Sequence, residues 1–234
     1  SIWLATVVVS GISYLSYLLK RYVFHESGVL VSGIIGGLYS STATISVLAR
    51  KSRKASAQEA NEYVAAMLLA VSMMFLRFMI LILIFSREIF MSIYPYLLIM
   101  SVVAAVVAWF IHSRQRRSKD LSADSEEEDS SNPLEFKVAL IFATLFVIFT
   151  VLTHYTLVYA GTGGLNLLSF VSGLSDITPF ILNLLQNTGS VAVLIVVACS
   201  MQAIISNILV NMFYALFFAG KGSKLRPWIL GGFG

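Results

Sequence analysis

Two charged residues, Arg77 and Asp176, lie inside long apolar stretches of this 234-residue chain. A charge at the centre of a bilayer costs at least about 2.5–3.5 kcal/mol on insertion scales, so such residues face a protein interior and mark ion paths. We expect the two side chains to compensate one another or a bound ion. Either they form a pair that only locks two helices together, or they line a polar pathway.

Two short motifs carry most of the other polar groups. One reads Gly36-Gly37-Leu38-Tyr39-Ser40-Ser41-Thr42, and the other reads Ser172-Gly173-Leu174-Ser175-Asp176-Ile177-Thr178. Hard cations prefer oxygen ligands of this kind. The candidate ion-binding residues are therefore Asp176, Ser40, Ser41, Thr42, Ser175, Thr178 and Asn207. Asp176 is their one carboxylate and hence the candidate metal ligand, while Arg77 is the candidate counter-charge or gate.

The second motif contains a signal for a broken helix. Pro179 has no amide hydrogen, so the Ser175 carbonyl loses its helical partner and the chain should kink or unwind at Asp176. Thr178 followed by Pro179 is typical of the N-cap and first residue of a new helix. Matching broken helices in two repeats are the best sequence pointer to a transporter's binding site. The alternative is that the hydroxyls bond the preceding turn within intact helices.

Small and amide residues indicate where helices approach. Gly33 and Gly37 are four residues apart, as are Ser169 and Gly173, and this spacing allows close helix packing. In the last apolar stretch four polar side chains share one broad face that should point inward: Gln202, Ser206, Asn207 and Asn211. If the two motifs belong to a genuine repeat, Asn207 occupies roughly the place of Arg77 in the third helix of its triplet. His154 is expected to be a packing residue.

No group of residues supports catalysis. One intramembrane carboxylate cannot form an aspartyl pair, and no Ser lies in a motif that also supplies a His base. Cys199 is the only cysteine of the chain, which excludes a disulfide framework and a Cys and His zinc cluster. The sequence indicates neither an enzyme nor a resident cofactor, apart from a bound metal cation such as Mg²⁺.

Composition identifies the elements that must position these residues. Apolar residues make up 58% of the chain and charged residues 12%, which excludes a soluble globule. Seven apolar segments are long enough to cross a bilayer as helices. They cover about residues 2–23, 28–49, 63–86, 89–112, 138–160, 165–185 and 190–219. The predicted fold class is an all-α transmembrane bundle of about seven helices.

The two motifs indicate an internal repeat. Each follows one apolar helix and precedes another, so segments one to three and five to seven form two three-helix repeats with broken or kinked motif helices. Segment four links them, and the repeats are expected to be parallel. Chance matching of Gly, Leu and Ser is the alternative. We expect a first repeat with its linking helix at 1–112, a charged cytoplasmic loop at 113–133 and a second repeat at 134–234.

Basic residues orient the chain and imply no nucleic-acid partner, since they lie at helix ends. The groups at 50–54 and 114–119 fall on one side, which should be cytoplasmic. The acidic run at 124–129 is expected to be a solvated linker, with a regulatory or metal-collecting role as the alternative. Counting every segment as a crossing sends Lys221, Lys224 and Arg226 outside, against the rule. Either the sixth segment is re-entrant or an eighth helix follows, and we favour the eighth helix.

The ordered motifs resemble a bacterial family. The Gly-Leu motifs, with Leu48-Ala49-Arg50, Met74-Phe75-Leu76-Arg77 and Ser206-Asn207, are similar to the C-terminal membrane domain of MgtC/SapB-related proteins. The resemblance implies a magnesium-transport component and a small MgtC-like domain before this one, which agrees with a first residue other than Met. Members commonly have a second acid where this chain has Thr178 and a Lys where it has Asn211. The missing acid weakens the case for Mg²⁺ ligation.

The leading hypothesis is a multi-pass transporter or channel of the bacterial inner membrane for a small ion, with a midplane site built from both motifs. The family favours a cation such as Mg²⁺, whereas Arg77 and helix N-termini favour an anionic solute. The second hypothesis is a non-transporting membrane module that regulates or scaffolds a partner. In that case Arg77 and Asp176 are a structural pair. The expected partners are the lipid bilayer, a small ion or solute, and a second copy in a homodimer.

Overall fold

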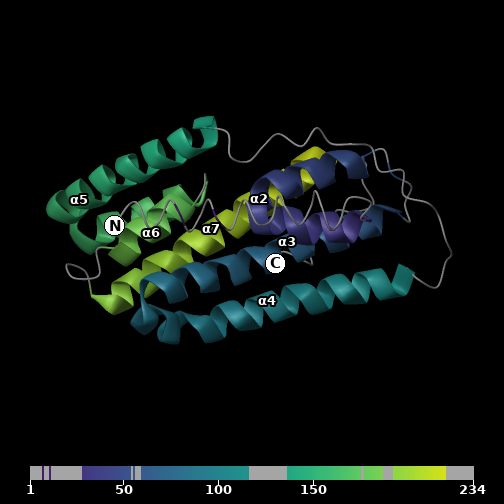
Figure 1. Ribbon diagram of the computed structural model, residues 1–234, viewed down its shortest axis with the longest axis horizontal. Coiled ribbons are helices and arrows are strands. Elements are labelled where there is room, and N and C mark those ends of the chain that lie inside the picture. The colour runs from purple at the N-terminus through teal and green to yellow at the C-terminus, as the bar shows by residue number, and fades with distance from the viewer. Residues whose placement is uncertain are drawn as a thin grey trace. The chain divides into compact units, whose positions relative to one another are not determined.

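Helices account for all the regular secondary structure in the residues that the structure describes. These residues are 7, 11, 28–53, 55, 59–115, 136–174, 177–186 and 192–219 of a computed structural model. Their helices, shown in Figure 1, are α2 (Val29–Ser52), α3 (Glu59–Phe85), α4 (Arg87–Gln115), α5 (Phe136–Ser172), α6 (Thr178–Gln186) and α7 (Val193–Ala219). The predicted all-α fold is confirmed.

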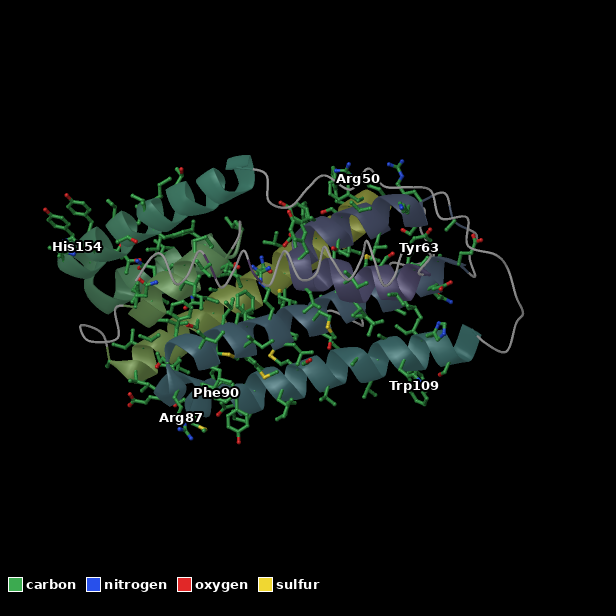
Figure 2. All side chains as sticks on the ribbon, viewed as in Figure 1. Arg50, Tyr63, Arg87, Phe90, Trp109 and His154 are labelled. Carbon is green, nitrogen blue, oxygen red and sulfur yellow. The ribbon has the colours of Figure 1, made fainter. Side chains whose placement is uncertain are left out.

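Four helices of the described ranges are long and apolar enough to cross a membrane, judged by length and composition. They are Val29–Ser52, Glu59–Phe85, Arg87–Ser113 and Val193–Phe218. Large apolar side chains are exposed along α4, among them Ile99 at 61% and Trp109 at 68%, and Figure 2 shows Trp109 projecting from the helix. Apolar surface of this extent marks contact with lipid. The chain is a helical membrane protein.

Four of the helices have nearly the bounds of predicted apolar segments. Segments 28–49, 63–86, 89–112 and 190–219 correspond to α2, α3, α4 and α7. Residues 7 and 11 are helical, and the remainder of segment 2–23 lies outside the described residues. Helix α4 runs through Gln115, so it includes the first residues of the predicted loop at 113–133. The rest of that loop also lies outside the described residues.

Gly161 divides α5 into two helical pieces. Its backbone angles are φ 59° and ψ −149°, a conformation essentially restricted to glycine. The first piece matches the predicted segment 138–160, and the second begins the predicted segment 165–185. The boundary that the sequence places between these two segments is therefore confirmed.

The sixth predicted segment is broken, as its Pro179 indicated. Helix α5 ends at Ser172, Gly173 and Leu174 form a turn, and α6 begins at Thr178. The Ile177 carbonyl accepts the amide of Ile181 at 3.0 Å, which makes Ile177 the N-cap and Thr178 the first helical residue. The new helix thus starts one residue earlier than the predicted Thr178 cap. Pro179 remains in the first turn, where a missing amide hydrogen costs little.

The chain forms two compact units, each assembled from separate parts of the sequence. The α2 unit comprises Ile12–Arg77, Leu97–Pro133 and Asn211–Gly234, and the α6 unit comprises Ser1–Gly11, Phe78–Tyr96 and Leu134–Val210. Helices α3, α4 and α7 each contribute one end to each unit, because the boundaries fall within them. The predicted division into two sequential repeats is a different partition and stays a prediction.

Candidate functional site

The first motif interrupts α2 at Ser40. Ser40 has φ −156° and ψ 103°, an extended conformation between two helical pieces. Its Oγ accepts the amide of Ala43 at 3.4 Å, which is the bond an N-cap side chain makes with the third residue of a helix. A helix N-terminus therefore begins at Ser41, inside an apolar segment.

The two pieces of α2 fold back on each other. Gly36 and Thr44 each lie four residues from Ser40, and a Cβ at Gly36 would overlap the Thr44 side chain. In a straight helix, residues eight apart are separated by about 12 Å along the axis. Contact between them requires α2 to form the two arms of a helical hairpin, with Ser40 at its tip.

Arg77 stabilises the first arm of this hairpin where it ends. Its Nη1 donates to the Tyr39 carbonyl oxygen at 2.8 Å, and only 8% of the residue is exposed. In a continuous helix the Tyr39 carbonyl would accept the Ala43 amide, but here that amide has Ser40 Oγ as an acceptor. A charged donor from α3 thus satisfies a carbonyl at the break.

Close packing of the first arm against α3 explains its glycines. A Cβ at Gly33 would overlap the backbone of Ala66, and one at Gly37 would overlap the backbone of Ala70. The predicted close approach at Gly33 and Gly37 is confirmed. Since both contacts advance together along the two helices, the first arm of α2 runs parallel to α3.

The second motif shows a similar arrangement within the α6 unit. A Cβ at Gly173 would overlap the side chain of Ser206, so the end of α5 lies directly against α7. Ser206 Oγ donates to the Phe170 carbonyl at 2.7 Å, and Asn207 Nδ2 donates to the Gly173 carbonyl at 3.2 Å. The last carbonyls of a helix lack the usual intrahelical partner. The Phe170 carbonyl accepts the Gly173 amide at 3.2 Å and gains a second donor from Ser206, and the Gly173 carbonyl gains a donor from Asn207.

The contacts in the two units have the same sequence separation. Gly33 and Ala66, like Gly37 and Ala70, are 33 residues apart, and so are Gly173 and Ser206. Cys199 Sγ and Asn166 Oδ1, at 3.4 Å, are also 33 residues apart. The second piece of α5 therefore runs parallel to α7, as the first arm of α2 runs parallel to α3.

The register of these contacts corrects one expectation. Asn207 comes one residue after the Gly173 contact at Ser206, whereas Arg77 comes seven residues after the Gly37 contact at Ala70. Asn207 does not hold the place of Arg77. What the two share is chemistry, since each donates to a carbonyl at the end of a broken helix.

Comparison with known protein families gives a match over residues 7–219 to a domain of unknown function, DUF4010. The chain belongs to the DUF4010 family. It is also similar to a protein of Aquifex aeolicus (strain VF5) described as "Uncharacterized protein", with 25% identity over 199 residues that cover 84% of this chain and 85% of that one. No solved structure matches. The resemblance to MgtC/SapB-related proteins stays a prediction.

The structure places five of the predicted site residues of this DUF4010 chain, together with Arg77. Ser40, Ser41 and Thr42 are at the tip of the α2 hairpin, with Ser41 buried and Thr42 half-buried. Thr178 is buried at the start of α6, and Asn207 is buried on α7. Ser175 and Asp176 lie outside the described residues, as does any pairing of Asp176. Within the described ranges no three His, Cys, Asp or Glu residues group as metal ligands.

Two polar contacts between helices were not expected from the sequence. Ser72 and Ser101 join α3 to α4 within the α2 unit, and each hydroxyl donates to the other's backbone carbonyl, at 2.9 and 3.1 Å. Asn183 Nδ2 donates to Thr150 Oγ1 at 2.8 Å and joins α6 to α5. The sequence signal that could have indicated both contacts is the presence of polar residues inside apolar segments. His154 was expected to be a packing residue, but it lies exposed on α5 (Figure 2).

Proposed function

We propose that this chain moves a small ion across a bacterial inner membrane, as a multi-pass transporter or channel. The observation that carries the proposal is the break of α2 at Ser40, inside an apolar segment. Non-helical backbone is tolerated at membrane depth only where it is buried in protein or lines a polar cavity. Transporters place their binding sites at such discontinuous helices.

The proposed ligands are the polar groups at the two breaks. Ser40, Ser41, Thr42 and Thr178 supply hydroxyl oxygens, and Asp176 with Ser175 supplies the charged part of the site. Two half-helices, one starting at Ser41 and one at Thr178, direct their positive ends toward these groups. That both motifs line one midplane site is the part of the proposal that comes from the sequence.

An internal repeat is part of the proposal, and two sequence separations support it. Gly37 and Gly173 are 136 residues apart, and each is followed three residues later by the polar residue at the break, Ser40 or Asp176. The common separation of 33 residues between packed positions agrees with two copies of one helical unit. Transporters with internal repeats carry their sites where the repeats meet.

The sign of the transported ion's charge depends on whether Asp176 or the positive groups, Arg77 and the helix N-termini, dominate the site. Asp176 and the resemblance to MgtC/SapB-related proteins favour a cation such as Mg²⁺, for which carboxylate and water oxygens are the usual ligands. Arg77 and the half-helix N-termini favour an anion or anionic solute. We take the cation as the first candidate, since Arg77 already donates to the Tyr39 carbonyl.

A second function, a non-transporting membrane module that regulates or scaffolds a partner, is favoured by that same bond. A charge that stabilises a break in the backbone has a purely structural use, and a closed, dry interior would then surround it. Both proposals include a homodimer and an MgtC-like domain before this chain in the full-length protein.

Ion flux into proteoliposomes tests transport. Wild-type protein should take up Mg²⁺ or a competing cation well above empty liposomes, and Asp176→Asn should reduce uptake at least about tenfold. Arg77→Gln, which removes the charge, should change the preference between cations and anions. The matched control is Glu88→Gln, which removes a carboxylate from the exposed first turn of α4. Unchanged flux in Asp176→Asn and Arg77→Gln would remove both residues from the mechanism and favour the regulatory module.

A further inference from the structure

We infer that the two broken segments are re-entrant hairpins that open toward opposite faces of the membrane. This inference deepens the proposed function, since it states from which side each polar tip is reached. It also replaces the sequence-based expectation that segments two and six each cross the bilayer and that the repeats are parallel.

The arms of the first hairpin are too short to cross. Val29–Tyr39 and Ser41–Ser52 contain 11 and 12 residues on either side of Ser40. At 1.5 Å per residue each arm extends about 17 Å, against a hydrocarbon core of about 30 Å. Because Gly36 meets Thr44, the arms fold back instead of adding their lengths. The tip at Ser40 thus reaches mid-membrane, and the segment leaves on the side where it entered.

The second hairpin follows from the direction of α7. Contacts between Asn166 and Cys199 and between Gly173 and Ser206 make the second piece of α5 parallel to α7. A chain that continued across through α6 would have to bring α7 back in the opposite direction. Helix α6 must therefore be the returning arm, and its 9 residues span only about 14 Å. Helix α6 lies against the first piece of α5, where Asn183 donates to Thr150 and Phe180 contacts Phe149.

The number of crossings sets the two openings. Between the hairpins the chain runs through α3, α4 and the first piece of α5. Helices α3 and α4 are candidate spans, and the first piece of α5, from Phe136 to the break at Gly161, has the length of a span. An odd number of crossings reverses the side, so the two hairpins enter from opposite faces. Repeats of opposite orientation with discontinuous helices are one of the known plans of secondary transporters.

The distribution of basic residues supports this topology independently. Of the 16 Lys and Arg residues, 14 come to the cytoplasmic side in this topology, and the exceptions are Arg77 inside α3 and Arg87 at the start of α4. Basic residues are retained on the cytoplasmic side. With two hairpins, the groups at 50–54, 114–119 and 221–226 all come to that side. The conflict over Lys221, Lys224 and Arg226 disappears without an eighth helix being needed to explain it.

Cysteine labelling in oriented membrane vesicles tests the inference. In a Cys199→Ala background, single cysteines replace Gly28 and Ala55, which flank α2, and Gly163 and Ala192, which flank the second hairpin. A membrane-impermeant maleimide should label Gly28→Cys and Ala55→Cys from the cytoplasmic face. It should label Gly163→Cys and Ala192→Cys from the opposite face, each at least about tenfold faster than from the wrong side.

The control pair is Ser86→Cys and Ser113→Cys, at the two ends of α4, which should be labelled from opposite faces. Labelling of Gly28→Cys and Ala55→Cys from opposite faces would overturn the first hairpin, and opposite labelling of the other pair would overturn the second. No labelling of a pair from either face would also contradict the inference, because hairpin ends must reach water. These results do not depend on transport, so failure of the proposed function gives a different pattern, namely correct labelling without ion flux.

Discussion

The Arg77 guanidinium donates from Nη1 to the Tyr39 carbonyl oxygen at 2.8 Å, immediately before Ser40 turns α2 back on itself. A buried carbonyl without a donor costs about 1–3 kcal/mol, and in lipid no water can replace the lost helical bond. One buried charge and one broken helix therefore stabilise each other. The same logic applies in the α6 unit, where neutral donors serve the carbonyls at the end of α5.

Replacing Ser40 tests its role as a cap. Ser40→Ala removes the acceptor for the Ala43 amide and should lower the free energy of unfolding by about 1 kcal/mol, whereas Ser40→Asn should retain most of it. Ser46→Ala is the matched control, because Ser46 Oγ only adds a second bond to the Thr42 carbonyl. Thermal unfolding in detergent measures all three. Equal losses in Ser40→Ala and Ser46→Ala would exclude the cap.

Adding a methyl group at Gly37 should separate the first arm of α2 from α3. The new Cβ meets the Ala70 backbone, which cannot move aside, so Gly37→Ala should cost about 1–3 kcal/mol. Gly163→Ala is the control, since nothing lies within 4 Å of its Cβ position. It should be neutral or stabilising by up to about 1 kcal/mol. Denaturant unfolding that ranks the two variants the other way would contradict the close packing.

Gly161→Ala should destabilise the chain although its Cβ has open space. With φ at 59° and ψ at −149°, an alanine is strained by about 1–3 kcal/mol. The contrast with Gly163→Ala, two residues away, isolates backbone conformation from packing. Equal melting temperatures for the two variants would show that α5 does not break at Gly161.

Removing the Ser206 hydroxyl should weaken the end of α5. Ser206→Ala removes one of the two donors to the Phe170 carbonyl, the other being the Gly173 amide, and should speed amide hydrogen exchange at residues 170–174 about fivefold. Ser200→Ala is matched to it, because the Ser200 hydroxyl is buried on the same helix and has no hydrogen-bond partner among the described residues. In Ser200→Ala, amide exchange at residues 170–174 should not change. A similar increase in both variants would mean that the Ser206 bond does not stabilise this end.

The sequence predicted the break in the sixth segment because Pro179 carries an unambiguous backbone signal. The break in the first motif was predicted only through its likeness to the second motif, because residues 36–44 contain no proline that would mark Ser40. Its break depends on Arg77, 38 residues away, and on the contact of Gly36 with Thr44. Local sequence patterns do not reveal contacts between residues so far apart in the chain.

In the inferred topology, the sequence takes hairpins for crossings for a physical reason. The whole of α2 has 24 residues and is apolar throughout, which are the length and composition of one transmembrane helix. Only the contacts distinguish a single span from two short arms. In the sequence, the charge count at Lys221, Lys224 and Arg226 is the feature that favours two short arms.

The most direct test of transport combines modification of the hairpin tip with ion flux. Ser40→Cys in a Cys199→Ala background is treated with a membrane-impermeant thiol reagent in proteoliposomes, with Val103→Cys on the exposed face of α4 as the control. We expect the reagent to modify Ser40→Cys and to reduce cation uptake at least about tenfold. Cation uptake by Val103→Cys should be unchanged. Full uptake after complete modification of Ser40→Cys would contradict a pathway at this tip.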